Sequence, residues 1–174
     1  MRLVTKALVF WCTVWAAPAF ASDFYTNFAA AVTRIDIAGD EVKPFLGSIR
    51  LGYEFADNFA LEVQYGMGMD DDKNAMDQKI KIDSQAAAFL RISSGSAYNN
   101  VRLYLLAGYS QMELSVDDAD PTDADKYDGF AWGVGAEEFL QSVKNLAFVA
   151  EYLRYYNRSE VSIDALSLGF RYKF

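Results

Sequence analysis

Ten charged residues stand at alternate positions within otherwise apolar or small-residue segments, a spacing that could build a buried ion network. They are Arg50, Glu54, Glu62, Asp83, Arg91, Arg102, Glu137, Glu151, Arg171 and Lys173. Successive side chains of a strand point to opposite faces, so alternate residues share one environment. Charges on an enclosed face remain ionised only when they are paired or hydrated. We therefore expect an internal network of salt bridges, with a wet interior that serves stability alone as the simpler alternative.

Aspartates gather in two stretches between these segments. One holds Asp70, Asp71, Asp72 and Asp77, and the other holds Asp117, Asp118, Asp120, Asp123, Asp125 and Asp128. Hard cations prefer oxygen ligands, but the second stretch lacks the Gly at position six and the Glu at position twelve of a calcium-binding hand. The stretches fit solvated surface loops. A weak Ca²⁺ or Mg²⁺ site at Asp117, Asp118, Asp120, Asp123 and Asp125 is the alternative, and the sequence predicts no other metal site.

The chain contains no His. This excludes Ser-His and Cys-His nucleophile pairs and His metal ligands. We expect a protein that is not an enzyme and that uses no cofactor.

The first 21 residues have the pattern of a secretory signal peptide. Arg2 and Lys6 precede an apolar run at 7–17, and Ala19-Phe20-Ala21 is a small-x-small cleavage pattern. The run is about half the roughly 20 residues that a membrane-spanning helix needs, and Pro18 interrupts it. The sequence thus predicts a signal peptide at 1–21 and one domain at 22–174, from which the chain's single Cys is absent.

The predicted domain is acidic. Arg2 and Lys6 are two of the 16 basic residues and the leader contains no acid, so 14 basic residues remain against 24 acidic ones. This balance disfavours nucleic acid as a partner.

Eight segments of roughly ten or more residues alternate between apolar and polar or small residues, which is typical of strands with two unlike faces. They are 24–35, 43–55, 59–69, 79–92, 101–115, 128–140, 146–157 and 162–174. The last places Leu166, Leu168, Phe170, Tyr172 and Phe174 on one face. Short connections alternate with longer, more acidic ones at 36–42, 70–78, 116–127 and 157–161. The pattern predicts an all-β, eight-stranded, antiparallel up-and-down barrel.

Two observations favour a transmembrane barrel over a soluble one of the lipocalin type. Aromatic residues gather near segment ends, as membrane interfaces favour: Tyr53, Phe55, Phe59, Phe139, Tyr172 and Phe174 near the short turns, and Phe45, Tyr65, Tyr109, Phe130, Trp132, Tyr152 and Tyr156 toward the long loops. The candidate inward residues are glycines and charges, which are too small and too polar for a dry core. We expect the apolar face to meet lipid.

Several motifs resemble the small opacity-type outer-membrane proteins, eight-stranded relatives of the OmpA transmembrane domain that are often described as porin-family barrels. The resemblance rests on 105–109 (LLAGY), 133–137 (GVGAE), 150–152 (AEY) and 168–174 (LGFRYKF). Glu138 departs from it, standing where relatives usually have an outward aromatic.

The resemblance implies a non-enzymatic structural or surface-interaction protein in the outer membrane of a Gram-negative bacterium, or alternatively a narrow channel for ions or small solutes. It implies that Phe170, Tyr172 and Phe174 form the signal read by the barrel-assembly machinery. The implied partners are outer-membrane lipid, lipopolysaccharide and a host or neighbouring-cell surface, with the protein acting as a monomer.

Overall fold

The computed structural model describes residues 23–37, 39–73, 79–95, 100–116, 125–158 and 160–174. Eight long strands form the structure: β1 (Phe24–Ile37), β3 (Phe45–Ala56), β4 (Phe59–Gly68), β6 (Lys79–Ser93), β7 (Val101–Val116), β8 (Asp125–Phe139), β9 (Leu146–Arg158) and β10 (Val161–Lys173). Two three-residue strands, β2 (Asp40–Val42) and β5 (Asp71–Lys73), pair with β1 and β6 beyond the residues that pair with β3 and β4. No helix in these ranges is long and apolar enough to cross a membrane.

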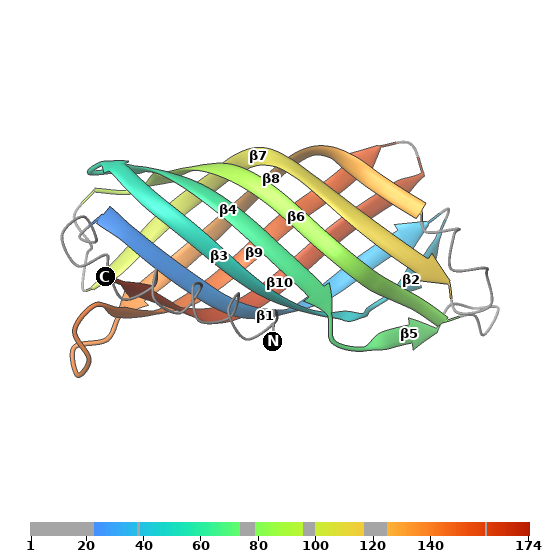
Figure 1. Ribbon diagram of the computed structural model, residues 1–174, viewed down its shortest axis with the longest axis horizontal. Coiled ribbons are helices and arrows are strands. Elements are labelled where there is room, and N and C mark those ends of the chain that lie inside the picture. The colour runs from blue at the N-terminus through green and yellow to red at the C-terminus, as the bar shows by residue number, and fades with distance from the viewer. Residues whose placement is uncertain (1–22, 38, 74–78, 96–99, 117–124, 159) are drawn as a thin grey trace, which may run out of the picture.

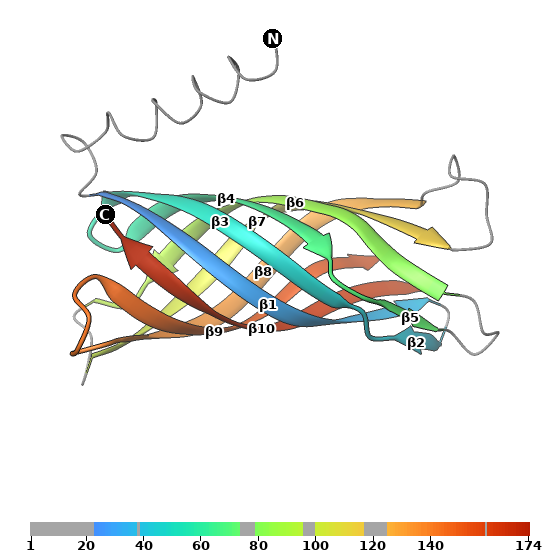
Figure 2. The ribbon, with the colours of Figure 1, turned by 60° about the horizontal axis from the view of Figure 1, so that its bottom comes forward.

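The eight long strands close into an antiparallel barrel (Figure 1). Each pairs with the next one along the chain, and β1 pairs with β10 over residues 25–37 and 161–173. Figure 2 shows β1 lying between β10 and β3, so the first and last strands complete the wall. Because the barrel is closed, none of the eight long strands is an edge strand. The predicted fold is therefore confirmed, and the strands match the predicted segments to within a few residues.

Large apolar side chains cover the outside of the barrel. On β3 and β4 these outward residues are Phe45, Ile49, Leu51, Tyr53, Phe55, Phe59, Leu61, Val63, Tyr65 and Met67, and β10 adds Leu166, Leu168, Phe170 and Tyr172. Leu51 is 54% exposed and Val63 is 58% exposed. A soluble barrel would turn such residues inward, so this arrangement excludes the lipocalin-type alternative.

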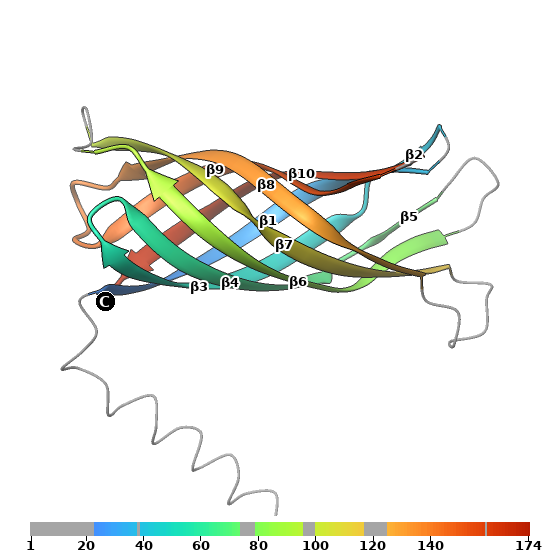
Figure 3. The same cartoon turned by 90° about the horizontal axis from the view of Figure 1, so that it is seen from above.

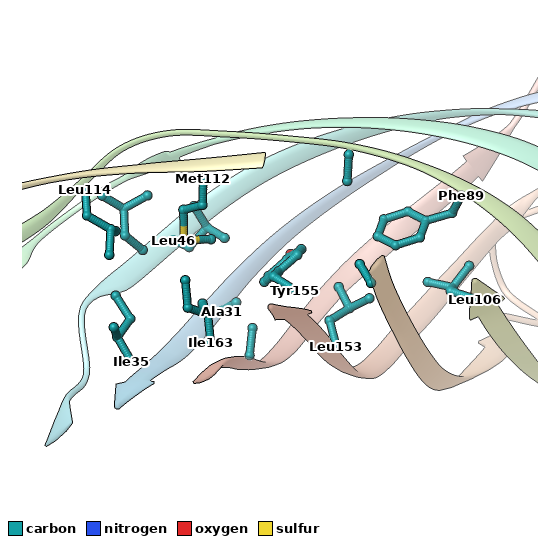
Figure 4. Packing of buried hydrophobic residues seen from close by; sticks show 14 of the residues in the cluster. Ala31, Ile35, Leu46, Phe89, Leu106, Met112, Leu114, Leu153, Tyr155 and Ile163 are labelled. Atoms are coloured by element: carbon teal, nitrogen blue, oxygen red, sulfur yellow. The ribbon is translucent and has the colours of Figure 1, made fainter. Parts of the chain in front are cut away.

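The prediction of a uniformly polar interior is wrong for one half of the barrel. Near the end that carries the long connections, the inner residues are apolar and almost fully buried: Ile35, Val42, Leu46, Ile82, Met112, Leu114, Leu153, Tyr155 and Ile163. Figure 4 shows several of them, including Leu46, Met112 and Ile163, packed across the lumen. We call these nine residues the apolar layer.

Two local irregularities explain why simple alternation missed part of this interior. The register between β6 and β7 shifts at Ile82/Ser84, so the inward positions change from Ile80 and Ile82 to Gln85 and Ala87. A second shift lies between Ile163 and Asp164 opposite β9, where Tyr155 is the unpaired residue. An extra residue in one strand moves the following side chains to the other face.

Two aromatics assigned to the outer belts turn inward. Tyr156, which follows the irregularity in β9, packs against the inner apolar cluster. Phe139 shares the inward face of β8 with Glu137, and the Arg102 guanidinium lies 5.2 Å from the centre of its ring.

Candidate functional site

The other half of the lumen contains a network of ion pairs centred on Glu62 of β4. The Glu62 carboxylate accepts a hydrogen bond from Arg50 at 3.1 Å and one from Arg91 at 3.4 Å, and it also accepts the Tyr25 hydroxyl. Glu62 and Arg91 are each 2% exposed. The alternation of β1, β3, β4 and β6 turns these four side chains inward.

A second acid, Glu151 of β9, receives Arg50 from across the barrel. The two terminal nitrogens of Arg50 donate to its two oxygens at 2.7 and 2.8 Å, a bidentate pair between residues 101 positions apart. The Arg50 Nε also donates to Gln64 at 2.9 Å, and Gln64 in turn donates to Gln85 and to the Tyr155 hydroxyl at 2.8 and 2.7 Å. This amide chain connects the ion network to the apolar layer.

Toward the end with the short turns, Glu137 and Glu54 continue the network. Arg91 and Arg171 contact the Glu137 carboxylate at 2.8 and 2.7 Å. Glu54, which is only partly buried, accepts Arg171 and Lys173. Arg102 approaches Glu137 at 3.7 Å and Glu54 at 4.0 Å.

Two tyrosines that the sequence did not suggest complete the site. The Arg91 guanidinium lies 3.7 Å from the ring centre of Tyr104, and that of Arg171 lies 3.9 Å from the ring centre of Tyr25. Tyr104 also donates to Glu151 at 2.8 Å. Such stacking on aromatic faces stabilises a desolvated guanidinium.

Glycines make room for both rings. A Cβ at Gly52 would collide with Tyr25, and one at Gly135 would collide with Tyr104. Gly52 is the register partner of Tyr25, and Gly135 is the register partner of Tyr104. The available sequence signal was therefore an inward Gly that faces an inward Tyr on the adjacent strand.

The fully buried charges balance. Three arginines (Arg50, Arg91 and Arg171) face three glutamates (Glu62, Glu137 and Glu151), all 4% exposed or less. Each of these three carboxylates contacts at least two arginine or tyrosine side chains. The arrangement neutralises charge in an enclosed space, and each of its three carboxylates is engaged.

Nine of the ten predicted residues are in this network, and Asp83 is not. Asp83 lies at the register shift in β6, is only partly buried, and accepts a hydrogen bond from Ser115 at 3.0 Å. The alternation that had placed it inward is interrupted at that residue.

The predicted cation site lies almost wholly outside the described residues. Asp117, Asp118, Asp120 and Asp123 are not among the described residues. Asp125 is the exposed first residue of β8. Among the residues that the structure describes, no group of three or more His, Cys, Asp or Glu side chains could hold a metal ion.

The three terminal aromatics lie on the outer wall at the end with the short turns. Phe170 packs edge-to-face on Phe148 of β9 with ring centres 5.7 Å apart, and Tyr172 contacts Phe174 at 5.4 Å. The Phe174 amide donates to the Phe24 carbonyl at 3.0 Å, which joins the last residue to the first strand.

Charged residues reappear on the outside above the apolar surface, near the long connections. Arg34 and Lys43 contact Glu41 at 2.6 and 2.8 Å. The hydrogen bond from Lys43, together with the charge of Arg34, holds the pKa of Glu41 below its ordinary value. On β9 and β10, Arg154 pairs with Asp164 at 2.6 Å. An apolar band that ends in charged residues is the expected profile of a membrane-embedded wall.

The sequence profile of the outer membrane protein beta-barrel domain matches residues 7–174. The chain belongs to this family. It is therefore a bacterial outer-membrane barrel, and its eight long strands are transmembrane strands whose apolar outer face meets lipid. This confirms the resemblance to small OmpA-like barrels that the motifs indicated.

Solved structures show the same fold. Neisserial surface protein A (NspA) matches with a TM-score of 0.70 and 23% identity, over 87% of this chain and 97% of that one. Ail of Yersinia pestis, in complex with the heparin analogue sucrose octasulfate, matches at 0.63 and 15% identity, over 87% and 98%. The N-terminal barrel domain of OprF from Pseudomonas aeruginosa matches at 0.59 and 16% identity, over 85% and 97%. No curated protein sequence is significantly similar to this chain.

Proposed function

We propose that this protein is a closed, non-enzymatic barrel of the outer membrane, whose role is structural and whose extracellular side contacts other surfaces. The observation that carries the proposal is the filled lumen. A balanced network of buried ion pairs occupies one half, and the apolar layer occupies the other. Eight strands leave an interior just wide enough for side chains to fill.

The two halves would obstruct ions for different reasons. An ion that enters the charged half must displace partners from pairs such as Arg50–Glu151. An ion that enters the apolar layer must lose its hydration without gaining a polar ligand, which costs many kcal/mol in a low-dielectric medium. Both costs support a barrel that does not conduct.

In planar bilayers, the refolded protein is expected to show no steady conductance steps. Neutralisation of one network charge, in Arg50→Ala or Glu151→Gln, should leave it closed because the apolar layer remains. An open porin inserted under the same conditions is the positive control. Steady channels whose conductance changes in these two variants would instead support the alternative, a narrow channel for ions or small solutes.

The absence of His supports a non-enzymatic role, since acid–base and nucleophilic catalysis most often use that residue. The aspartate-rich connections at 70–78 and 116–127 would keep the extracellular surface hydrophilic and available for contact with a host or neighbouring cell. Cation binding by the second connection stays a prediction.

Export and assembly form part of the same proposal. Residues 1–21 would act as a removable signal peptide, since their basic start, apolar run and small-x-small ending have that pattern. The outward aromatics Phe170, Tyr172 and Phe174 would be read by the barrel-assembly machinery. Outer-membrane lipid, including lipopolysaccharide, would surround a monomeric barrel.

Deletion of Phe174 is expected to lower the amount of folded barrel in outer membranes several-fold. The deletion removes the terminal aromatic and its backbone hydrogen bond to Phe24. The measurement is the heat-modifiable fraction on gels of outer-membrane preparations. Phe174→Tyr, which keeps an aromatic ring, should assemble normally. If the deletion variant refolds poorly in detergent as well, the defect is one of stability and the signal role is contradicted.

A further inference from the structure

The wall has a notch between β8 and β9 at the end with the long connections, which the proposed function places outside the cell. Their ladder ends at the pair Trp132↔Arg154, although β8 begins at Asp125 and β9 continues to Arg158. The other edges of these two strands stay paired: β8 pairs with β7 as far as Asp125, and β9 pairs with β10 as far as Arg158. Figure 3 shows β8 running away from the β9–β10 pair toward this end.

Aromatic and polar side chains line a pocket of about 230 Å³ in this notch. Phe130 and Trp132 come from β8, and Arg154, Tyr156, Asn157 and Arg158 come from β9. Gly129 contributes no side chain that would fill the space. Residues 125–131 of β8 and 156–158 of β9 have no ladder partner across the notch, so the peptide groups that point into it can bond to a polar ligand. The Tyr155 carbonyl already accepts a hydrogen bond from Ser110.

The two arginines of the notch differ in their engagement. Arg154 is fixed by Asp164 at 2.6 and 3.2 Å and by the Tyr152 hydroxyl at 3.3 Å, and its guanidinium lies 5.9 Å from the Trp132 ring. Arg158 is exposed and makes no salt bridge within the described ranges. Arg158 is therefore the group that can engage an anion.

The notch lies at the upper edge of the lipid-facing band. On β8 the outward residues change from Phe130, which is 66% exposed, to Asp128. On β10 they change from Leu166 to Asp164, which pairs with Arg154. Headgroups of the outer leaflet occupy this level of a membrane.

We propose that the notch binds the phosphorylated sugar headgroup of an outer-leaflet glycolipid. A sugar ring presents an apolar C–H face that Trp132 and Phe130 can cover, and hydroxyls that Asn157 and the free peptide groups can bond. Its phosphate pairs with Arg158, and its acyl chains continue down the apolar wall. The inference rests on the outer-membrane location and is independent of whether the lumen conducts.

Trp132 reports on the notch directly, because the other two Trp residues, Trp11 and Trp15, precede residue 22. Residues 22–174, which contain every strand that the structure describes, are refolded in detergent and titrated with lipopolysaccharide cut to lipid A and its inner sugars. We expect a saturable change in Trp132 emission, and at least a tenfold weaker response to the dephosphorylated glycolipid. Phosphatidylglycerol and inorganic phosphate are the comparison probes. No saturable change, or an equal response to either comparison probe or to the dephosphorylated form, would overturn the proposal.

Arg158→Gln is expected to weaken binding at least tenfold, since it removes the charge that faces the phosphate. Arg34→Gln is the matched control: it removes another exposed arginine above the apolar band, at a site on β1 that pairs with Glu41. Heat-modifiable migration verifies that both variants are folded. Equal losses in the two variants would indicate general charge attraction and contradict a specific site, as would unchanged binding by Arg158→Gln.

Discussion

Replacement of Glu62 with Gln is expected to destabilise the folded barrel by about 3–5 kcal/mol, the usual cost of removing one partner of a buried ion pair. Glu62 is the acid shared by Arg50, Arg91 and the Tyr25 hydroxyl. Without its charge, three buried arginines would face two buried glutamates. The measurement is the free energy of unfolding in urea, followed by Trp132 emission in phospholipid vesicles.

Glu113→Gln is the matched control for this prediction. Glu113 pairs with Lys126 at 3.3 Å, but its side chain is 37% exposed, so the loss should stay within about 1 kcal/mol. The double variant Glu62→Gln/Arg91→Gln restores the charge balance and should lose less stability than the sum of its two single variants. A cost of Glu62→Gln no greater than that of Glu113→Gln would mean that water, and not the protein, compensates these charges.

Gly135→Ala is expected to cost about 1–3 kcal/mol, although it adds a single methyl group. The new Cβ would collide with the ring of Tyr104. To relieve the collision, that ring must move away from Arg91, which lies 3.7 Å from its centre, and from Glu151, to which its hydroxyl donates at 2.8 Å. The same unfolding experiment measures the effect.

The cause can be isolated with a double-mutant cycle. In a Tyr104→Leu background the ring is absent, so Gly135→Ala should cost at least about 1 kcal/mol less than in the unaltered protein. Gly95→Ala is the control, because a Cβ at Gly95 meets no atom within 4 Å. Equal costs of Gly135→Ala in both backgrounds would show that Tyr104 is not what the glycine accommodates.

The network and the apolar layer together account for a lumen filled by side chains alone. Buried ion pairs by themselves contribute little net stability, because desolvation offsets their attraction. We expect their effect to be on specificity, because a bidentate pair such as Arg50–Glu151 links β3 and β9 across the barrel. The apolar layer adds close packing in the other half, and Gln64 and Tyr155 connect the two parts.

The sequence by itself determined the strands, their outward face and their membrane environment. The reason is local: a period of two in segments such as 59–69 and 162–174 follows directly from strand geometry, and lipid favours apolar residues at the outward positions of the membrane-embedded band. The same periodicity predicted which charges point inward, and the structure brings nine of those ten residues together.

Only the tertiary structure decided which inward charges meet. Arg50 and Glu151 are 101 residues apart, and their distance of 2.7 Å depends on barrel closure and on the register of the strands between them. The irregularities at Ile82/Ser84 and at Tyr155 also escaped alternation, because one extra residue reverses the faces beyond it. For the same reason Asp83 left the network, and Ile80 and Ile82 were not anticipated as inward residues. Periodicity gives each residue a face, but the partners on that face depend on register and closure, which are properties of the whole barrel.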